Sequence, residues 1–191
     1  MLLPTKPSMA EPKIHNIMNV KYFIASCLII LCVATASAQN PTLPKQVKNL
    51  TVLSLDGKAA TLPHFGEKNL LIFYVDPDKY KQNAAFTEEL EANKKAASDN
   101  IYGFGVMNLA DAPLIPNRLA RALAQRRTAK NGATILADQT HTMRDAWGLG
   151  DCNNLFVLMI VNMDGELVYC HKGELSRDDI NHFYDVIAQY R

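Results

Sequence analysis

A cluster of charged and aromatic residues follows the apolar segment 69–75. It consists of Asp76, Asp78, Lys79, Tyr80 and Lys81. If a helix begins just after this turn, the N–H groups at its start and the two lysines could together hold a carboxylate, phosphate or sulfate. A simpler interpretation is that the two aspartates cap the helix and the lysines are solvated. The sequence leaves both interpretations of the turn open.

Cys152 and Cys170 are the second group of residues that could do chemistry. Cys152 precedes the apolar segment 155–162, and Cys170 lies in the segment 166–172 that follows it. Three interpretations are open. The thiols could be inert, or they could form a disulfide, which their even number favours in an oxidising compartment. Alternatively, Cys152 could be a reactive thiol whose pKa is lowered by nearby lysines.

The spacing of the two cysteines argues against the disulfide. If a hairpin turns at Met163 and Asp164, Cys170 lies opposite about Val157. Cys152 is then about 17 Å further along an extended strand. Since bridged cysteines have Cα atoms within about 7 Å of each other, the pair can be joined only if the loop before residue 155 folds back.

No other motif predicts a metal, cofactor or nucleotide site. The histidines at 64, 141, 171 and 182 show no pairing at helical spacing, and the sequence has no phosphate-binding loop and no G-x-S-x-G motif. A formal net charge of +1 over 191 residues gives no basic bias toward nucleic acid. We therefore expect no metal, no cofactor and no nucleic-acid partner.

The pattern of apolar residues predicts the elements that position these groups. Apolar runs predict strands at 69–75, 101–109, 133–138, 155–162 and 166–172. Amphipathic and capped segments predict helices at 84–97, 117–127, 140–147 and 176–191. Alternation around Asp56-Gly57 predicts a hairpin over 50–62. This order predicts an α/β fold, namely a three-layer α/β/α sandwich with a mixed sheet and an N-terminal β-hairpin extension.

Two of the predicted helices carry further signals. In helix 117–127, Leu119 and Leu123 are expected to face inward, and the arginines form a basic face that is either solvated or able to dock an acidic partner. At the start of the last helix, Ser176 and Asp179 predict an approximate capping box.

Residues 18–38 have the pattern of a secretory signal peptide. Lys21 precedes an apolar run that ends at Val33, and Ala36-Ser37-Ala38 matches a cleavage site. We expect 1–17 to be an over-called extension, 39–48 to be a lead-in and 49–191 to be the folded domain. Because the apolar run is shorter than the ~20 residues of a spanning helix, we expect a periplasmic or secreted protein without a membrane span.

The order of elements and several landmarks resemble the thioredoxin-like superfamily, in particular its TlpA-like and peroxiredoxin-related members. The landmarks are the hairpin Asp56-Gly57-Lys58 with Leu62 and Phe65, the strand 69–75, and the turn 162–167 followed by Gly173 and a final helix. The resemblance places the family's CxxC motif at Lys79-Tyr80-Lys81-Gln82 and its cis-proline near Leu155-Phe156. Because neither the cysteines nor the proline stands there, the departure argues against thiol-disulfide or peroxidase activity of the family type.

A narrower resemblance is to the YtfJ-type periplasmic proteins, a branch of the fold that also lacks the CxxC motif. It rests on Lys79 and Asn83, on Asn108-Leu109-Ala110-Asp111-Ala112, and on Ala146-Trp147. This resemblance implies secretion and a thioredoxin-like domain, but no established reaction. The wider resemblance also implies that the loop around Cys152 faces the 76–82 turn.

These observations predict a secreted or periplasmic, redox-inactive thioredoxin-like domain that acts as a binding or protein-interaction module. Its expected surface is formed by the 76–82 turn and the 150–156 loop, and its expected partner is a protein or a small anionic ligand. The alternative function is a divergent thiol-disulfide or peroxide-handling oxidoreductase that uses Cys152, with or without Cys170.

Overall fold

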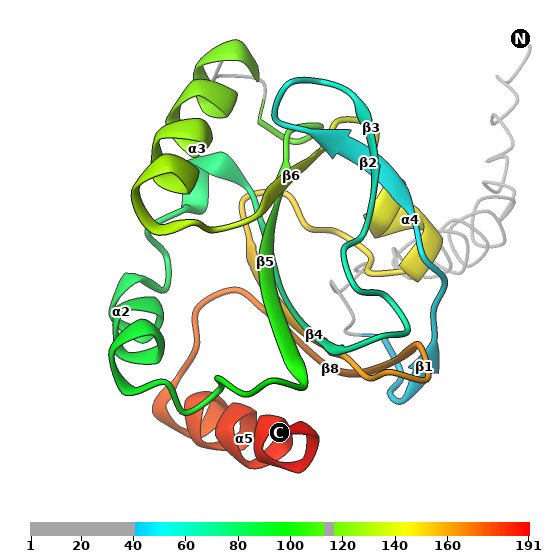
Figure 1. The fold of residues 1–191 in the computed structure, drawn as a ribbon, viewed down its shortest axis with the longest axis vertical. Helices are drawn as coiled ribbons and strands as arrows, with labels where there is room; N and C mark the ends of the chain where they lie inside the picture. Colours follow the sequence, from blue (N-terminus) through cyan, green and yellow to red (C-terminus); the bar gives the residue numbers. More distant parts are fainter. Residues whose placement is uncertain (1–40, 113–116) are drawn as a thin grey trace, which may run out of the picture. The chain divides into compact units, whose positions relative to one another are not determined.

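The computed structural model describes residues 41–112 and 117–191, which fold around one eight-stranded mixed sheet (Figure 1). The strands are β1 (Lys45–Gln46), β2 (Thr51–Ser54), β3 (Ala59–Thr61), β4 (Asn69–Val75), β5 (Ile101–Asn108), β6 (Ile135–Asp138), β7 (Phe156–Val161) and β8 (Glu166–Lys172). The helices are α2 (Ala84–Asn93), α3 (Asn117–Asn131), α4 (Thr142–Trp147) and α5 (Arg177–Ile187), with the short 3-10 helices η1 (Pro77–Lys79) and η2 (Ala188–Tyr190). The predicted order of strands and helices is confirmed.

β4 lies in the middle of the sheet, whose strand order is β1-β8-β7-β4-β5-β6-β2-β3. It runs parallel to β5 and antiparallel to β7, and β5 runs parallel to β6. β7 is buried along its whole length, which explains its uninterrupted apolar sequence. Because β4, β5 and β6 are parallel, their carboxyl ends meet at one edge of the sheet, and the polar turn after β4 lies at this edge.

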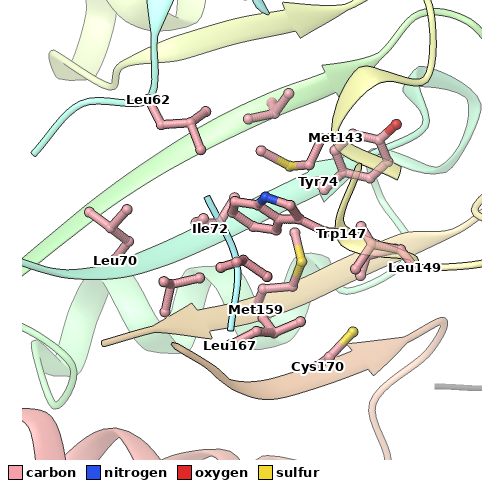
Figure 2. Close-up of a cluster of buried hydrophobic side chains, with 14 of the residues drawn as sticks. Leu62, Leu70, Ile72, Tyr74, Met143, Trp147, Leu149, Met159, Leu167 and Cys170 are labelled. Carbon is pink, nitrogen blue, oxygen red and sulfur yellow. The ribbon is translucent and has the colours of Figure 1, made fainter. Parts of the chain in front are cut away.

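Successive side chains of β4 point to opposite faces of the sheet and contribute to two cores. On one face, Ile72 packs in a cluster with Met143 and Trp147 of α4 (Figure 2). On the other face, Leu71 packs in a cluster with residues of α2 and α5. The sheet is therefore covered by helices on both faces, which confirms the three-layer α/β/α architecture.

α3 packs through small side chains rather than through the leucines that the pattern suggested. Ala120 and Ala124 are buried, and Ala120 clusters with Ala137 of β6. The inward placement of Leu119 is wrong, because its side chain is 53% exposed. The alanines are four residues apart and form an equally regular stripe, which lets the helix approach the sheet closely. The side chain of Leu123 lies outside the described residues.

The ends of the other helices follow local capping rules. α2 is shorter than predicted, since Lys94 adopts a left-handed conformation with φ of 52° and ends the helix after Asn93. The predicted capping box of α5 is confirmed. Ser176 accepts a hydrogen bond from Asp179 N, and the carboxylate of Asp179 accepts one from Ser176 N.

The sheet begins inside the segment 39–48, which was expected to be a lead-in. Lys45 of β1 lies opposite Leu167 of β8, and Val47 is buried. A strand of two residues has no periodicity that a sequence pattern could reveal. The β2–β3 hairpin is the predicted extension and joins the sheet through β6. The segments 1–17 and 18–38 lie outside the described residues, and none of the described helices is long and apolar enough to cross a membrane.

Candidate functional site

Asp76 fastens the 76–82 turn to the loop that precedes β7. Its carboxylate accepts a hydrogen bond from Asn154 N at 2.8 Å and another from Asp78 N at 2.9 Å. The backbone N–H of Asp76 also donates to Leu155 O at 3.0 Å. The structure therefore brings together the two segments that the sequence analysis assigned to one surface.

The far end of the turn is held by two amide side chains. Gln82 accepts a hydrogen bond from Phe156 N through its Oε1 atom at 2.9 Å. Asn83 is buried, donates to Gly173 O at 2.9 Å and accepts from Leu175 N at 3.0 Å. Because both ends of the turn are fixed to neighbouring elements, its central residues are displayed on a well-defined backbone.

Tyr80 projects from this turn into solvent. Its side chain is 61% exposed, the largest fraction for any large hydrophobic side chain in the described part of the chain. The Nζ atom of Lys81 lies 5.4 Å from the centroid of the Tyr80 ring, within the range of a cation–π contact. Asp78 and Lys81 are exposed, and Lys79 is partly buried. All these side chains are available to a partner at least in part.

The geometry does not place the lysines at the start of a full helix. Asp76 is the N-cap of η1, whereas α2 begins only at Ala84, beyond both lysines. The backbone donor at the start of η1 is thus engaged by the protein's own carboxylate. Burial raises the pKa of Asp76 above its ordinary value, although the hydrogen bonds from Asp78 and Asn154 oppose this rise.

Cys152 lies in the loop that a hydrogen bond from Asn154 joins to the turn, but it is not accessible. Its residue is fully buried, and its Sγ atom lies 3.7 Å from Gly150 O. Burial raises the pKa of the Cys152 thiol to about 11, and the positive charges of Lys172 and Arg144 only partly offset this effect. Of the three interpretations of the cysteines, the one with a lowered pKa disagrees with this environment, because desolvation outweighs the attraction of the cations.

Cys170 is also buried, and the two cysteines are free thiols in this structure. Burial raises the pKa of Cys170 to about 12. The predicted register of the hairpin is shifted, since Cys170 lies opposite Met159 and not Val157. The pair Val161 and Leu167 next to the turn already differs by one residue from the predicted register, and the irregularity between Ile160 and Val161 adds the second. It was not predicted because the turn residues alone do not reveal a bulge.

A second polar network lies at the ends of β5 and β6, and the sequence analysis did not identify it as a site. Asn108 is buried and donates to Asp111 Oδ2 at 2.7 Å, and the other oxygen of Asp111 lies 2.6 Å from Nε2 of His141. Burial tends to raise the pKa of Asp111, but the hydrogen bonds from Asn108 and His141 hold it below its ordinary value. Asn108 and Asp111 lie in one of the segments on which the resemblance to YtfJ-type proteins rests, and this resemblance was the only sequence signal for the network.

Asp138 lies at the end of β6, opposite Asn108 in the sheet, and has hydrogen bonds of its own. Its buried carboxylate accepts hydrogen bonds from Thr142 N and Met143 N at 2.8 Å each, so it satisfies donors at the start of α4. The hydroxyl of Tyr74 donates to the same carboxylate at 3.3 Å. Burial, together with the negative charge of Asp138, raises the pKa of Tyr74.

The chemistry of this edge is that of a hydrogen-bonded frame. Each buried carboxylate described above accepts at least two hydrogen bonds, and the two thiols have raised pKa values. In residues 41–112 and 117–191, no group of three His, Cys, Asp or Glu side chains is arranged to hold a metal ion. The exposed residues at this edge lie on the turn around Tyr80 and, in the loop before β7, at Asp151, Asn153 and Asn154.

No protein-family model and no curated protein matches this sequence. Solved structures share its fold. A candidate protein disulfide isomerase from Bacteroides thetaiotaomicron has a TM-score of 0.56 at 15% identity, over 77% of this chain and 88% of that chain. A thiol-disulfide oxidoreductase from Bacteroides fragilis has a TM-score of 0.53 at 13% identity, over 75% of this chain and 99% of that chain. BsSco, a member of the Sco family of cytochrome c oxidase assembly proteins, has a TM-score of 0.50 at 14% identity, over 80% of this chain and 99% of that chain.

Proposed function

We propose that this chain, which has the thioredoxin-like fold, is a redox-inactive binding module. Its recognition face consists of Asp78, Lys79, Tyr80 and Lys81 on the 76–82 turn, with the exposed Asn153 on the 150–156 loop. The partner is a protein segment or a small ligand with anionic groups. The fold supplies the frame, and the residues at its chemistry-bearing edge supply contacts in place of a redox motif.

The exposure of Tyr80 carries this proposal. Tyrosine is enriched at the centre of protein interfaces, and Tyr80 is the most exposed large hydrophobic residue in the described part of the chain. The turn beneath Tyr80 is held at both ends by hydrogen bonds that Asp76 accepts from Asn154 N and Gln82 accepts from Phe156 N. A partner would therefore meet a side chain that is already positioned, with a smaller loss of conformational entropy on binding.

The charges around Tyr80 indicate what the partner carries. Lys79 and Lys81 flank the ring in sequence, and Asp78 is the acidic residue of the recognition face. A carboxylate on the partner would pair with the two ammonium groups, and an apolar or aromatic group beside it would pack against the Tyr80 ring. This chemistry favours an acidic peptide segment or an organic anion over a neutral apolar ligand.

The environment of the thiols supports this proposal over the oxidoreductase alternative. A nucleophilic cysteine needs a thiolate and access to its substrate. Cys152 and Cys170 are both buried, and the pKa values of their thiols are raised to about 11 and about 12. Neither thiol has the properties that disulfide exchange at neutral pH requires.

We also propose that the protein works in the periplasm or outside the cell. The signal-like segment 18–38 and the narrower resemblance to YtfJ-type proteins support this location. Mass spectrometry of the protein isolated from producing cells should then give a mature chain that begins at Gln39. A chain that retains residues 18–38 in full would contradict the proposal.

Site-specific photocrosslinking tests the recognition face. A photoreactive amino acid at position 80 should yield discrete crosslinked species in the producing cells. The matched control is position 189, which is exposed on η2. Position 189 lies at the opposite end of β4 from the turn, because the carbonyl of the neighbouring Tyr190 accepts a hydrogen bond from Asn69, the first residue of β4. Equal crosslinking from both positions, or none from position 80, would contradict a recognition role for Tyr80.

A further inference from the structure

Two adjoining hollows lie between α3, the β2–β3 hairpin and β6, away from the recognition face. The first has a volume of about 380 Å³ and is lined by Leu55, Arg118, Arg121, Ala122, Gln125 and Gln139. The second has a volume of about 530 Å³, shares Leu55 and Gln125 with the first, and continues along β6 to Leu136. Both volumes fall within the range typical of small-molecule sites.

Arg121 lines the first hollow. Its Nη1 atom lies 3.1 Å from the position that a Cβ atom on Gly57 would occupy, so the guanidinium reaches the hairpin turn. Its Nε atom is buried and has no hydrogen-bond partner in the described part of the chain. Buried N–H donors without acceptors are rare and destabilising in native proteins. Because the Nε atom is buried, it does not itself face the hollow, and the guanidinium keeps one donor that no acceptor in the described residues satisfies.

The chain does not supply a carboxylate to this arginine. Within residues 41–112 and 117–191, neither Arg118 nor Arg121 forms an ion pair with an acidic side chain. Asp56 stands on the adjoining hairpin turn, but it is paired with Lys58 at 2.9 Å and accepts a hydrogen bond from Ser54. Two uncompensated guanidinium groups and two glutamine amides thus face one hollow.

The second hollow has a different lining. Five of its eleven lining residues are apolar, namely Leu55, Ala129, Ala133, Ile135 and Leu136, and Asp56 lines it as well. Thr128 also lines it, and the buried Oγ1 atom of Thr128 has no hydrogen-bond partner within the described residues. A ligand that fills both hollows would carry an oxyanion at one end and a less polar body with one polar group at the other.

We propose that these hollows form a binding site for a small organic anion. Its carboxylate or phosphate accepts hydrogen bonds from the guanidinium of Arg121, with Arg118 as a second positive charge. The planar fork of an arginine fits either oxyanion with two parallel hydrogen bonds. The body of the anion lies against Leu55 and extends toward Thr128. This site is independent of the recognition face and of the function proposed for it.

The side-chain N–H signal of Arg121 in a nitrogen-15 NMR spectrum reports on this site directly. The full mature protein is titrated separately with succinate, glycerol 3-phosphate and inorganic phosphate. Saturable shifts of the Arg121 Nε–H signal and of the amide signals of Gln125 and Gln139 are expected. Comparing succinate with glycerol 3-phosphate identifies the preferred oxyanion, and inorganic phosphate shows whether the organic body contributes.

Two arginine variants separate a built site from general surface charge. Arg121→Gln should weaken binding about tenfold or more, because a charge-assisted pair of hydrogen bonds is lost. Arg126→Gln removes the same charge from an exposed position of α3 that lines neither hollow, and it should leave the affinity unchanged. Arg121→Lys should fall between the wild type and Arg121→Gln. Absence of saturable shifts with all three probes, or equal loss in Arg121→Gln and Arg126→Gln, would overturn the proposal. Tyr80→Ala should not alter these titrations.

Discussion

At the scale of single residues, burial decides the properties of Cys152. A sequence pattern shows that a thiol and several cations are near one another, and this pattern alone suggests a lowered pKa. The structure shows instead that the residue has no exposed surface. Loss of hydration destabilises the thiolate by more than the positive charges of Lys172 and Arg144 stabilise it. Burial of this kind depends on the packing of distant elements and is not visible in the local sequence.

Alkylation rates test this conclusion about the thiols. A rise of the pKa of Cys152 from 9.0 to about 11 lowers the thiolate fraction at pH 7 about 100-fold. The native protein should therefore react with a maleimide at least about 100-fold more slowly than the protein unfolded in urea, at the same pH. Labelling of Cys152 in the native protein at the rate of a free cysteine would show that the thiol is accessible.

Some positions of the candidate site were predictable from the local sequence, whereas its contacts between distant segments were not. The positions at the end of β4 were predictable, because an apolar run that stops at Asp76 marks the carboxyl edge of the sheet. The hydrogen bond from Asn154 to Asp76 was not predictable, since it joins residues far apart in the chain. The contact between Asp111 and His141 was missed for the same reason, as no local spacing links the loop after β5 to the start of α4.

At the scale of elements, the Asp111–His141 contact fastens the loop after β5 to α4. Asp111→Ala would leave the donors of Asn108 and His141 without their acceptor. We expect a loss of about 1–3 kcal/mol in the free energy of unfolding at pH 7. Urea unfolding of the wild type and the variant measures this difference. Glu67→Ala is the control, because its pair with His64 is exposed and should contribute less than about 1 kcal/mol.

The pH dependence of this loss follows from the lowered pKa of Asp111. An aspartate whose pKa is lower in the folded state stabilises the fold at pH values above its ordinary pKa, for which the reference is 3.8. This contribution disappears as the pH falls through the lowered value. The difference between the wild type and Asp111→Ala should therefore shrink below pH 3.8. A difference that stays constant or grows on acidification would contradict the assigned role.

The long elements were predictable, whereas the short and irregular ones were not. β4 and β7 were found because strands buried on both faces have continuous apolar sequences. β1 has two residues and owes its pairing to β8, so its own sequence contains no signal. The bulge in the β7–β8 hairpin likewise depends on the partner strand. Packing of α3 through alanines instead of Leu119 shows that a short apolar stripe does not fix which side of a helix faces the sheet.

At the scale of the whole molecule, the chain has the fold of the solved thiol-disulfide oxidoreductases, and both cysteines in residues 41–112 and 117–191 are buried. The sheet and the helices on both of its faces match this fold. The turn after β4 contacts the loop before β7 at the carboxyl edge of the sheet, where α/β proteins bind ligands. In this chain the meeting point is closed by Asp76, Gln82 and Asn154. The outward side presents Tyr80 with Lys81. An edge whose described residues hold no accessible thiol agrees with the recognition role that we propose.

An insulin-reduction assay with dithiothreitol as the electron donor tests the central claim most directly. It compares the mature wild-type protein with Cys152→Ser, using dithiothreitol alone as the baseline and an active thioredoxin as the positive control. We predict that the wild type does not accelerate precipitation of insulin above the baseline and that Cys152→Ser behaves identically. Acceleration by the wild type that disappears in Cys152→Ser would show that this domain works through thiol chemistry.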